Sequence, residues 1–269
     1  MTPTKALTFS AVDDFGFAYA RGLLSPAHLP HLYAPNRLGP LLELIFLIEG
    51  GHLPSWIIST SLASSGAAPL IQAILDNREH WLSPENRRMG IIRAHRKSPS
   101  GDNIFSSFLM NAQRAARNVA GLLGSTPGQL VAAMEELENN IHEHSEATET
   151  GVLAFRAARG IFEFVAADRG VGVLSSLKRC PTYSLLSDHG TALELALKDG
   201  NSRFGANSIR GHGFRPIFIG LMNLQGALRF RSGDHAMLID GTSPDLTNAQ
   251  LAQKPLLGGF LASVACQIA

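Results

Sequence analysis

The sequence is poor in the residues that mark several specialised protein classes. Only 2 of its 269 residues are cysteine, so no disulfide framework can hold the fold, and a reducing compartment is expected. Its 23 basic side chains against 22 acidic ones leave a net charge of +1, which excludes binding of nucleic acid by net positive charge alone. Hydrophobic residues make up 45%, which excludes a disordered or collagen-like chain.

Long hydrophobic runs are also missing. The most apolar stretch, 41–53, contains Glu43, Glu49 and two glycines, and is too short and too charged to span a bilayer. The first ten residues are polar and mixed, unlike a signal peptide. We therefore expect a cytoplasmic protein without a membrane segment. Its length suits one large domain or two small ones, with a core that needs no covalent staples.

Residues 1–101 carry no chemical motif, and we interpret them as a smaller N-terminal α/β region of unknown role. Residues 41–48 fit either a helix or a buried strand, because periodicity alone does not separate the two. Residues 56–60 predict a short strand, and residues 68–74 predict the beginning of a helix. A boundary near residue 102 would leave residues 102–269 as the second domain.

A basic cluster precedes this boundary. It consists of Arg87, Arg88, Arg93, Arg96 and Lys97, and a Ser-Pro-Ser-Gly segment follows it. Two interpretations remain: a solvated face with a loop, or a contact with an acidic partner.

Two helices are predicted next, over about 105–119 and from Thr126 to about Ser145, with Pro127 at the first helical position. In the second helix, one apolar stripe is formed by Leu130, Met134, Leu137 and Ile141. Glu136, Asn140 and His144 form a separate polar stripe at four-residue spacing. A glutamate can act as a general base, and an asparagine oxygen suits Mg²⁺. The alternative is an ordinary amphipathic helix with a polar outer face.

The segment 161–167 is rich in β-branched and aromatic residues, which predicts a strand. It ends at Asp168, followed by Gly170 and Gly172, and two glycines permit a tight turn close to a ligand. An ionised aspartate at this rim can accept a hydrogen bond from an amino group such as that of adenine. A dinucleotide-binding turn is the rival, with Ser175 in place of the third glycine and a later acid at Asp188 or Glu194.

A second glycine turn, with Gly211 and Gly213, follows a polar segment that suits a lid over a ligand. Backbone N–H groups at such a turn favour phosphate. Beyond it, segments 227–233 and 236–241 predict the two strands of a hairpin, and residues 260–268 predict a last strand.

These three motifs, in this order, resemble those of the GHKL superfamily of ATP-binding proteins. Residues 136–145 resemble its N box, residues 168–172 its G1 box, and residues 211–213 its G2 box. The resemblance covers about residues 105–269 and is closest to stand-alone proteins of the anti-sigma-factor serine kinase type. Among the departures, Glu143 replaces the basic residue of many kinase members, and Gly259-Phe260 replaces the final Gly-Thr.

The resemblance implies a two-layer α/β (α+β) sandwich, with helices on one face of a mixed β-sheet, known as the Bergerat ATP-binding fold. It implies ATP and Mg²⁺ as cofactors, Glu136 as the catalytic base and Asn140 as the Mg²⁺ ligand. It assigns adenine recognition to Asp168, and nucleotide binding to the four glycines at 170, 172, 211 and 213. Glu135 and Asn139 are also four residues apart, but only the register of Glu136 retains the family's leucine.

Two functions are compatible with this resemblance. One is an ATPase or phosphotransferase, in which the protein positions the phosphates and neutralises their charge. The other is a non-catalytic module, in which a bound nucleotide orders the lid for a protein partner.

Overall fold

The computed structural model describes residues 5–26, 33–61, 66–94, 99–197, 226–240 and 249–267. The helices are α1 (Phe9–Ala20), α2 (Leu38–Glu49), α3 (Trp56–Ser61), α4 (Ala68–Leu75), α5 (Pro99–Asn118), α6 (Thr126–His144), α7 (Gly172–Leu177) and α8 (His189–Leu197), with short 3₁₀ helices at Thr148–Thr150 and Pro181–Tyr183. The strands are β1 (Lys5–Ala6), β2 (Tyr33–Ala34), β3 (His80–Leu82), β4 (Met89–Arg93), β5 (Val152–Ala158), β6 (Ile161–Asp168), β7 (Gly226–Asp240) and β8 (Gln250–Gln267). Within these ranges, no helix combines the length and the apolar character that a membrane crossing needs.

One six-stranded sheet dominates the molecule, in the order β3-β4-β5-β6-β8-β7, and every neighbouring pair in it is antiparallel. The expectation of a mixed sheet was therefore wrong for this sheet. The reason is visible where β4 ends and β5 begins, since the Ala94 N–H donates to the Gly151 carbonyl. Helices α5 and α6 bring the chain back to the same end of the sheet at which β4 ends, so β5 runs antiparallel to β4. A parallel neighbour would require a connection that crosses to the opposite end of the sheet. A separate pair, β1 and β2, is parallel.

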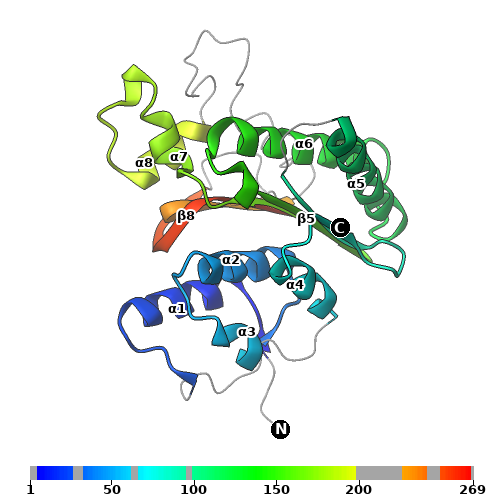
Figure 1. Ribbon diagram of the computed structural model, residues 1–269, viewed down its shortest axis with the longest axis horizontal. Coiled ribbons are helices and arrows are strands. Elements are labelled where there is room, and N and C mark those ends of the chain that lie inside the picture. Colours follow the sequence, from blue (N-terminus) through cyan, green and yellow to red (C-terminus); the bar gives the residue numbers. More distant parts are fainter. Residues whose placement is uncertain are drawn as a thin grey trace.

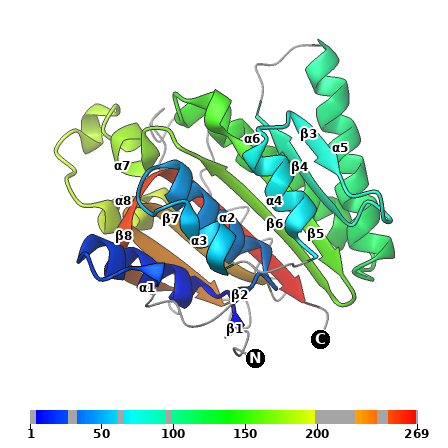
Figure 2. The same cartoon turned by 60° about the horizontal axis from the view of Figure 1, so that its bottom comes forward.

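Helices cover both faces of the sheet, so the expected two layers are three. Helices α5 to α8 lie on one face and α1 to α4 on the other (Figure 1). Figure 2 brings the second helix layer forward and shows α2 lying along the sheet. Each face has its own hydrophobic core, and β6 contributes Phe162 and Phe164 to one core and Val165 and Ala167 to the other. The coarser assignment, an α+β sandwich, is confirmed.

The first hundred residues supply a helix layer and two strands of the common sheet. The expected boundary near residue 102 lies inside α5, and β4 before it pairs with β5 after it, from Met89↔Arg156 to Arg93↔Val152. Residues 38–47 of α2 are buried on every side, which explains their unbroken apolar pattern. The predicted boundary therefore falls near the change from one helix layer to the other, and the parts of the chain before and after it share one sheet.

Charged side chains join the α1–α2 layer to the sheet. We call them the interlayer charge cluster, and they are Asp13 of α1, Glu43 of α2, Arg229 and Arg231 of β7, and Lys254 of β8. Glu43 and Arg231 are fully buried (0% exposed) and paired with each other. The Arg229 guanidinium donates to Glu43 Oε2 at 2.8 Å and to Asp13 Oδ1 at 2.7 Å. Opposite charges therefore satisfy each other inside the protein.

Both cysteines are unpaired and buried. Cys180 follows α7, and Cys266 lies near the end of β8, paired with Phe162 of β6 and Gly226 of β7. Burial raises the pKa of the Cys266 thiol to about 12.

Candidate functional site

Helix α6 forms where the sequence predicts it and contains most of the residues that resemble an N box. Its apolar stripe, Leu130, Met134, Leu137 and Ile141, is buried in the core shared with α5. On the polar stripe, Glu136 is exposed, whereas Asn140 and His144 are half-buried. The polar stripe thus becomes less exposed toward the C-terminal end of α6.

The two histidines of α6 point to different partners, as their two-residue spacing requires. His142 Nε2 lies 2.5 Å from Glu138 Oε1 on the same helix, and His144 Nδ1 lies 3.3 Å from Ser176 Oγ of α7. The contact with Ser176 shows that the C-terminal end of the polar stripe faces α7.

Asn140 lies one turn before His144 on the same stripe. Its Nδ2 atom is buried and has no hydrogen-bond partner. A buried amide donor without a partner is destabilising by about 1–3 kcal/mol, so such a group is expected to serve a ligand or another function. Asn140 is therefore the residue of α6 best placed to take a polar ligand.

Asp168 ends β6 and is almost completely buried, at 4% exposed. Its Oδ1 accepts a hydrogen bond of 2.8 Å from the Gly170 N–H. Burial raises the pKa of Asp168 from 3.8 to about 6, against a smaller lowering by that hydrogen bond. A buried carboxyl at the end of a strand is a suitable acceptor for a ligand N–H group.

The loop after Asp168 approaches neighbouring backbone too closely for side chains. A Cβ on Gly170 would overlap the Ser145 carbonyl, and the Val171 N–H donates to that same carbonyl at 2.9 Å. Gly172 has a φ of +73°, and a Cβ there would lie 2.8 Å from Ser232 Oγ of β7. Both predicted glycines are therefore required by the geometry of the loop.

Hydrogen bonds fix this loop between α6 and the sheet. Ser232 Oγ accepts from the Val173 N–H at 2.9 Å and donates to the Gly259 carbonyl at 2.8 Å. We call this region, made of His144, Ser145, Asp168–Gly172, Ser176 and Ser232, the α6–β6 junction. It joins the predicted N-box helix to the predicted G1 loop in space.

Arg169, inside the glycine loop, reaches the other helix layer. Its guanidinium pairs with Glu49 at the end of α2 and lies 5.7 Å from the centre of the Phe46 ring. The Arg169 N–H also donates to Thr150 Oγ1 at 2.9 Å. The glycine loop is therefore in direct contact with the N-terminal region.

The structure thus unites Asp168, Gly170 and Gly172 with the end of α6. Asn140 lies one turn before the junction, and Glu136 lies eight residues from His144, about 12 Å along the helix. Gly211 and Gly213 lie outside the described residues. In the described part of the chain, no three histidine, cysteine or acidic side chains are grouped to hold a metal ion. A cation here would need the Asn140 oxygen together with ligand oxygens and water.

Sequence reasoning did not find Arg169, Ser176 or Ser232 as parts of this region. Ser176 and Ser232 contact it only through the folded arrangement of α7 and β7, and nothing in their local sequence signals this. Arg169 could have been suspected, because it lies between the aspartate and the first glycine.

No family model, no curated protein and no solved structure matches this chain.

Proposed function

We propose that the protein binds ATP with Mg²⁺ at the α6–β6 junction and hydrolyses the nucleotide or transfers its γ-phosphate, as histidine kinase-like ATPases do. The observation that carries the proposal is Asp168, a buried carboxyl in the loop closed by Gly170 and Gly172. The exocyclic amino group of adenine is a donor for such a carboxyl, and the Gly170 N–H already orients Oδ1.

Asn140 supports the phosphate side of the proposal. Its Nδ2 has no partner, so the side-chain amide is not committed to the fold. The Asn140 oxygen would hold Mg²⁺, which supplies charge neutralisation for the phosphates. The amide nitrogen would then donate to a phosphate oxygen.

Glu136 is the proposed base. It would accept a proton from water, or from a partner's hydroxyl, as that oxygen attacks the γ-phosphorus and the bond from this phosphorus to the bridging oxygen breaks. Its exposure on α6 leaves it free to reach a nucleophile beside the helix.

A second candidate function is nucleotide-dependent binding of a protein partner without catalysis. Two observations favour it: the exposed Glu136 lies two turns from the junction, and Arg169 joins the glycine loop to Glu49 of α2. A nucleotide at the junction would then act on the N-terminal helix layer through this ion pair.

Nucleotide binding is tested by thermal denaturation in the presence of ATP, ADP or NAD, each with and without Mg²⁺. We expect ATP with Mg²⁺ to stabilise the wild type, by about 2.7 kcal/mol at a concentration one hundred times the dissociation constant. Asp168→Asn should abolish this stabilisation. Asp76→Asn is the matched control, because Asp76 lies at the end of α4 and pairs with Arg78. An equal ATP shift in Asp168→Asn and wild type contradicts adenine recognition, and a shift with NAD alone supports the dinucleotide interpretation.

Hydrolysis is tested by phosphate release. We expect Glu136→Gln to lose turnover and keep the ATP-induced thermal shift. Glu135→Gln, one residue away and also exposed on α6, should keep both. Loss of turnover in Glu135→Gln instead would support the other register. If the wild type binds ATP but neither releases phosphate nor modifies a partner, the non-catalytic function is supported.

A further inference from the structure

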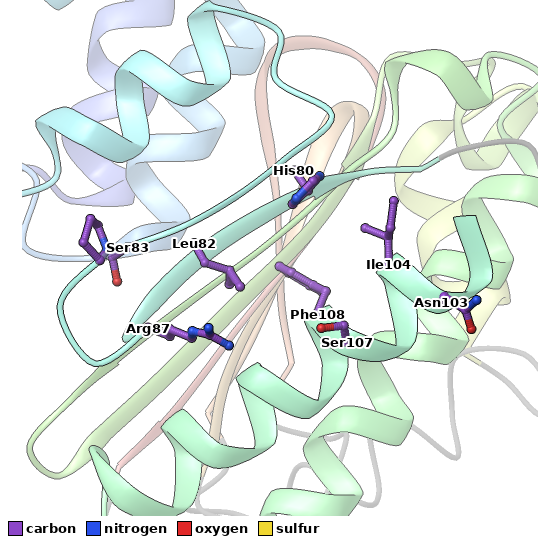
Figure 3. A pocket seen from close by; sticks show the side chains of 9 residues that line it. His80, Leu82, Ser83, Arg87, Asn103, Ile104, Ser107 and Phe108 are labelled. Carbon is purple, nitrogen blue, oxygen red and sulfur yellow. The ribbon is translucent and has the colours of Figure 1, made fainter. Parts of the chain in front are cut away.

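A pocket of about 600 Å³ lies between β3, the turn that follows it, and α5 (Figure 3). Strand β3 forms the edge of the sheet opposite to β7, so the pocket is separate from the α6–β6 junction. Its volume falls within the range of small-molecule sites in proteins, about 300–1,000 Å³.

One wall of the pocket is apolar. Leu82 of β3 and Ile104 and Phe108 of α5 supply it, and Figure 3 shows the Phe108 ring extending from α5 toward Leu82. Gly90 lies beneath both side chains, since a Cβ there would be 2.6 Å from Leu82 and 3.2 Å from Phe108. The wall therefore offers a packed hydrophobic surface to the body of a ligand.

The polar lining is basic or neutral. It includes Arg87, His80 and Ser107, and among the described residues no Asp or Glu side chain lines the pocket. Arg87 takes part in no ion pair among the described residues, whereas the adjacent Arg88 pairs with Glu85 at 2.9 Å. Arg87 Nη1 donates to Asn111 Oδ1 at 3.0 Å, which draws the guanidinium toward α5. Its other N–H donors remain for a ligand, because a guanidinium carries five of them.

The backbone at Arg87 adopts a conformation that ordinarily selects glycine. Asn86 and Arg87 have φ values of 51° and 46°, and the Arg88 N–H closes the turn on the Glu85 carbonyl at 3.4 Å. Two successive positive φ angles define the hairpin turn for which Asn-Gly is preferred. An arginine in the glycine position is disfavoured by its Cβ, so the presence of this side chain needs another reason.

The other described arginines of the basic cluster found in the sequence have partners outside the pocket. Arg93 is buried and donates to the Ile74 carbonyl at 2.9 Å, and Arg88 is paired. Arg96 and Lys97 lie outside the described residues. Among the described arginines of the cluster, Arg87 alone lines the pocket.

We propose that this pocket binds a small organic carboxylate, with its anionic group on Arg87 and its apolar body against Leu82 and Phe108. The planar guanidinium matches two carboxylate oxygens with two parallel hydrogen bonds. Ser107, which also lines the pocket, supplies a further hydroxyl donor. The volume of about 600 Å³, within the range of small-molecule sites, favours a small molecule over a segment of another protein.

The test is a ligand-observed NMR titration of the full chain with two carboxylates, phenylacetate and octanoate, and with their neutral amides. We expect saturable binding of at least one carboxylate, at least tenfold tighter than its amide. Arg87→Gly should weaken this binding at least tenfold, and Arg87→Lys should weaken it less, because the charge remains without the planar fork. Arg88→Gly, the adjacent control, should leave the affinity within about twofold.

Arg87→Gly also separates binding from folding. Since glycine suits the φ of 46°, which offsets the lost hydrogen bond to Asn111, this variant should keep a cooperative thermal transition. Equal affinity for acid and amide, equal binding by Arg87→Gly and wild type, or equal losses in Arg87→Gly and Arg88→Gly would each overturn the proposal. Binding of a polyglutamate peptide without binding of either small carboxylate would overturn it in favour of an acidic protein partner.

Discussion

Asp168 shows how position changes the chemistry of a single carboxyl. At 4% exposed it loses most of its hydration, and one backbone N–H from Gly170 replaces only part of it. Its pKa is therefore raised from 3.8 to about 6. A raised pKa means that the folded state holds this proton more tightly than the unfolded state does, so ionisation of Asp168 opposes folding.

We therefore predict that Asp168→Asn stabilises the protein in a pH-dependent way. Below about pH 4, Asp168 is protonated in both the folded and unfolded states, so its ionisation does not affect stability. Above about pH 6 it is ionised in the folded state, and the penalty approaches roughly 3 kcal/mol, from about two pKa units at about 1.4 kcal/mol each. Urea denaturation at pH 4.5 and pH 8 should show the advantage of Asp168→Asn growing with pH. An advantage that shrinks as the pH rises would contradict the raised pKa.

Gly170 provides a second prediction for a single residue. A methyl group there would collide with the Ser145 carbonyl, which is backbone and cannot rotate away. We expect Gly170→Ala to lower the free energy of unfolding by about 1–3 kcal/mol or more. Gly128→Ala in α6 is the control, because its Cβ would meet only the Gln113 side chain at 3.6 Å. That substitution should stabilise the helix by about 0.5–1 kcal/mol, and equal effects of the two substitutions would contradict close packing at Gly170.

At the scale of helices and strands, the sequence pattern predicted the elements whose structure depends mainly on residues close in sequence. The apolar periodicity of α5 and α6 and the β-branched content of β6 predicted these elements correctly. Residues 56–60, predicted as a strand, form part of helix α3, because five residues carry too little pattern to separate a strand from a helix. The apolar run in α2 was ambiguous for a related reason: it is buried on all sides and shows no polar face.

Long-range pairing explains the other errors. The two strands predicted over 227–233 and 236–241 are, as far as Asp240, a single strand, β7. It has an irregularity at Gly233, and it pairs with β8 rather than folding back on itself. The interlayer charge cluster could not be predicted either. Asp13 and Glu43 are 216 and 186 residues from Arg229 in sequence, and each resembles a surface charge when considered alone.

That cluster leads to a prediction for α2. Burial alone would raise the pKa of Glu43, but Arg231 and Arg229 outweigh it and hold that pKa below its usual range. Glu43 therefore contributes stability above its ordinary pKa of 4.5, which is lost as the pH falls through its lower folded pKa. We expect Glu43→Gln to lower the free energy of unfolding at pH 7 by about 3–5 kcal/mol, because two buried guanidinium groups lose their main counter-charge.

Glu85→Gln is the control for Glu43→Gln, and both are measured by urea denaturation. Glu85 pairs with Arg88 at an exposed site, where the side chains are 76% and 46% exposed. Its loss should change stability by less than about 1 kcal/mol. Similar effects for the two substitutions would mean that the buried cluster contributes no more than a surface pair.

For the whole molecule, the sheet between two helix layers predicts the behaviour of a fragment. Removal of residues 1–98 would uncover Val165, Ala167 and Leu261 and leave Arg229 and Arg231 without Glu43. We therefore expect a fragment of residues 99–269 to aggregate or to lack a cooperative thermal transition in circular dichroism. A soluble fragment with a sharp transition would instead support residues 102–269 as an independent domain.

The reaction rates of the two buried thiols, Cys180 and Cys266, can be used to measure local unfolding of the protein. A cysteine reacts only when it is accessible and deprotonated, and Cys266, near the end of β8, is neither, with its pKa raised to about 12. Its alkylation rate therefore measures how often the end of β8 opens between β6 and β7. Cys180 lies just past α7, so its rate records local release of the helix beside the glycine loop. A ligand that tightens that loop would slow the modification of Cys180 without any label being introduced.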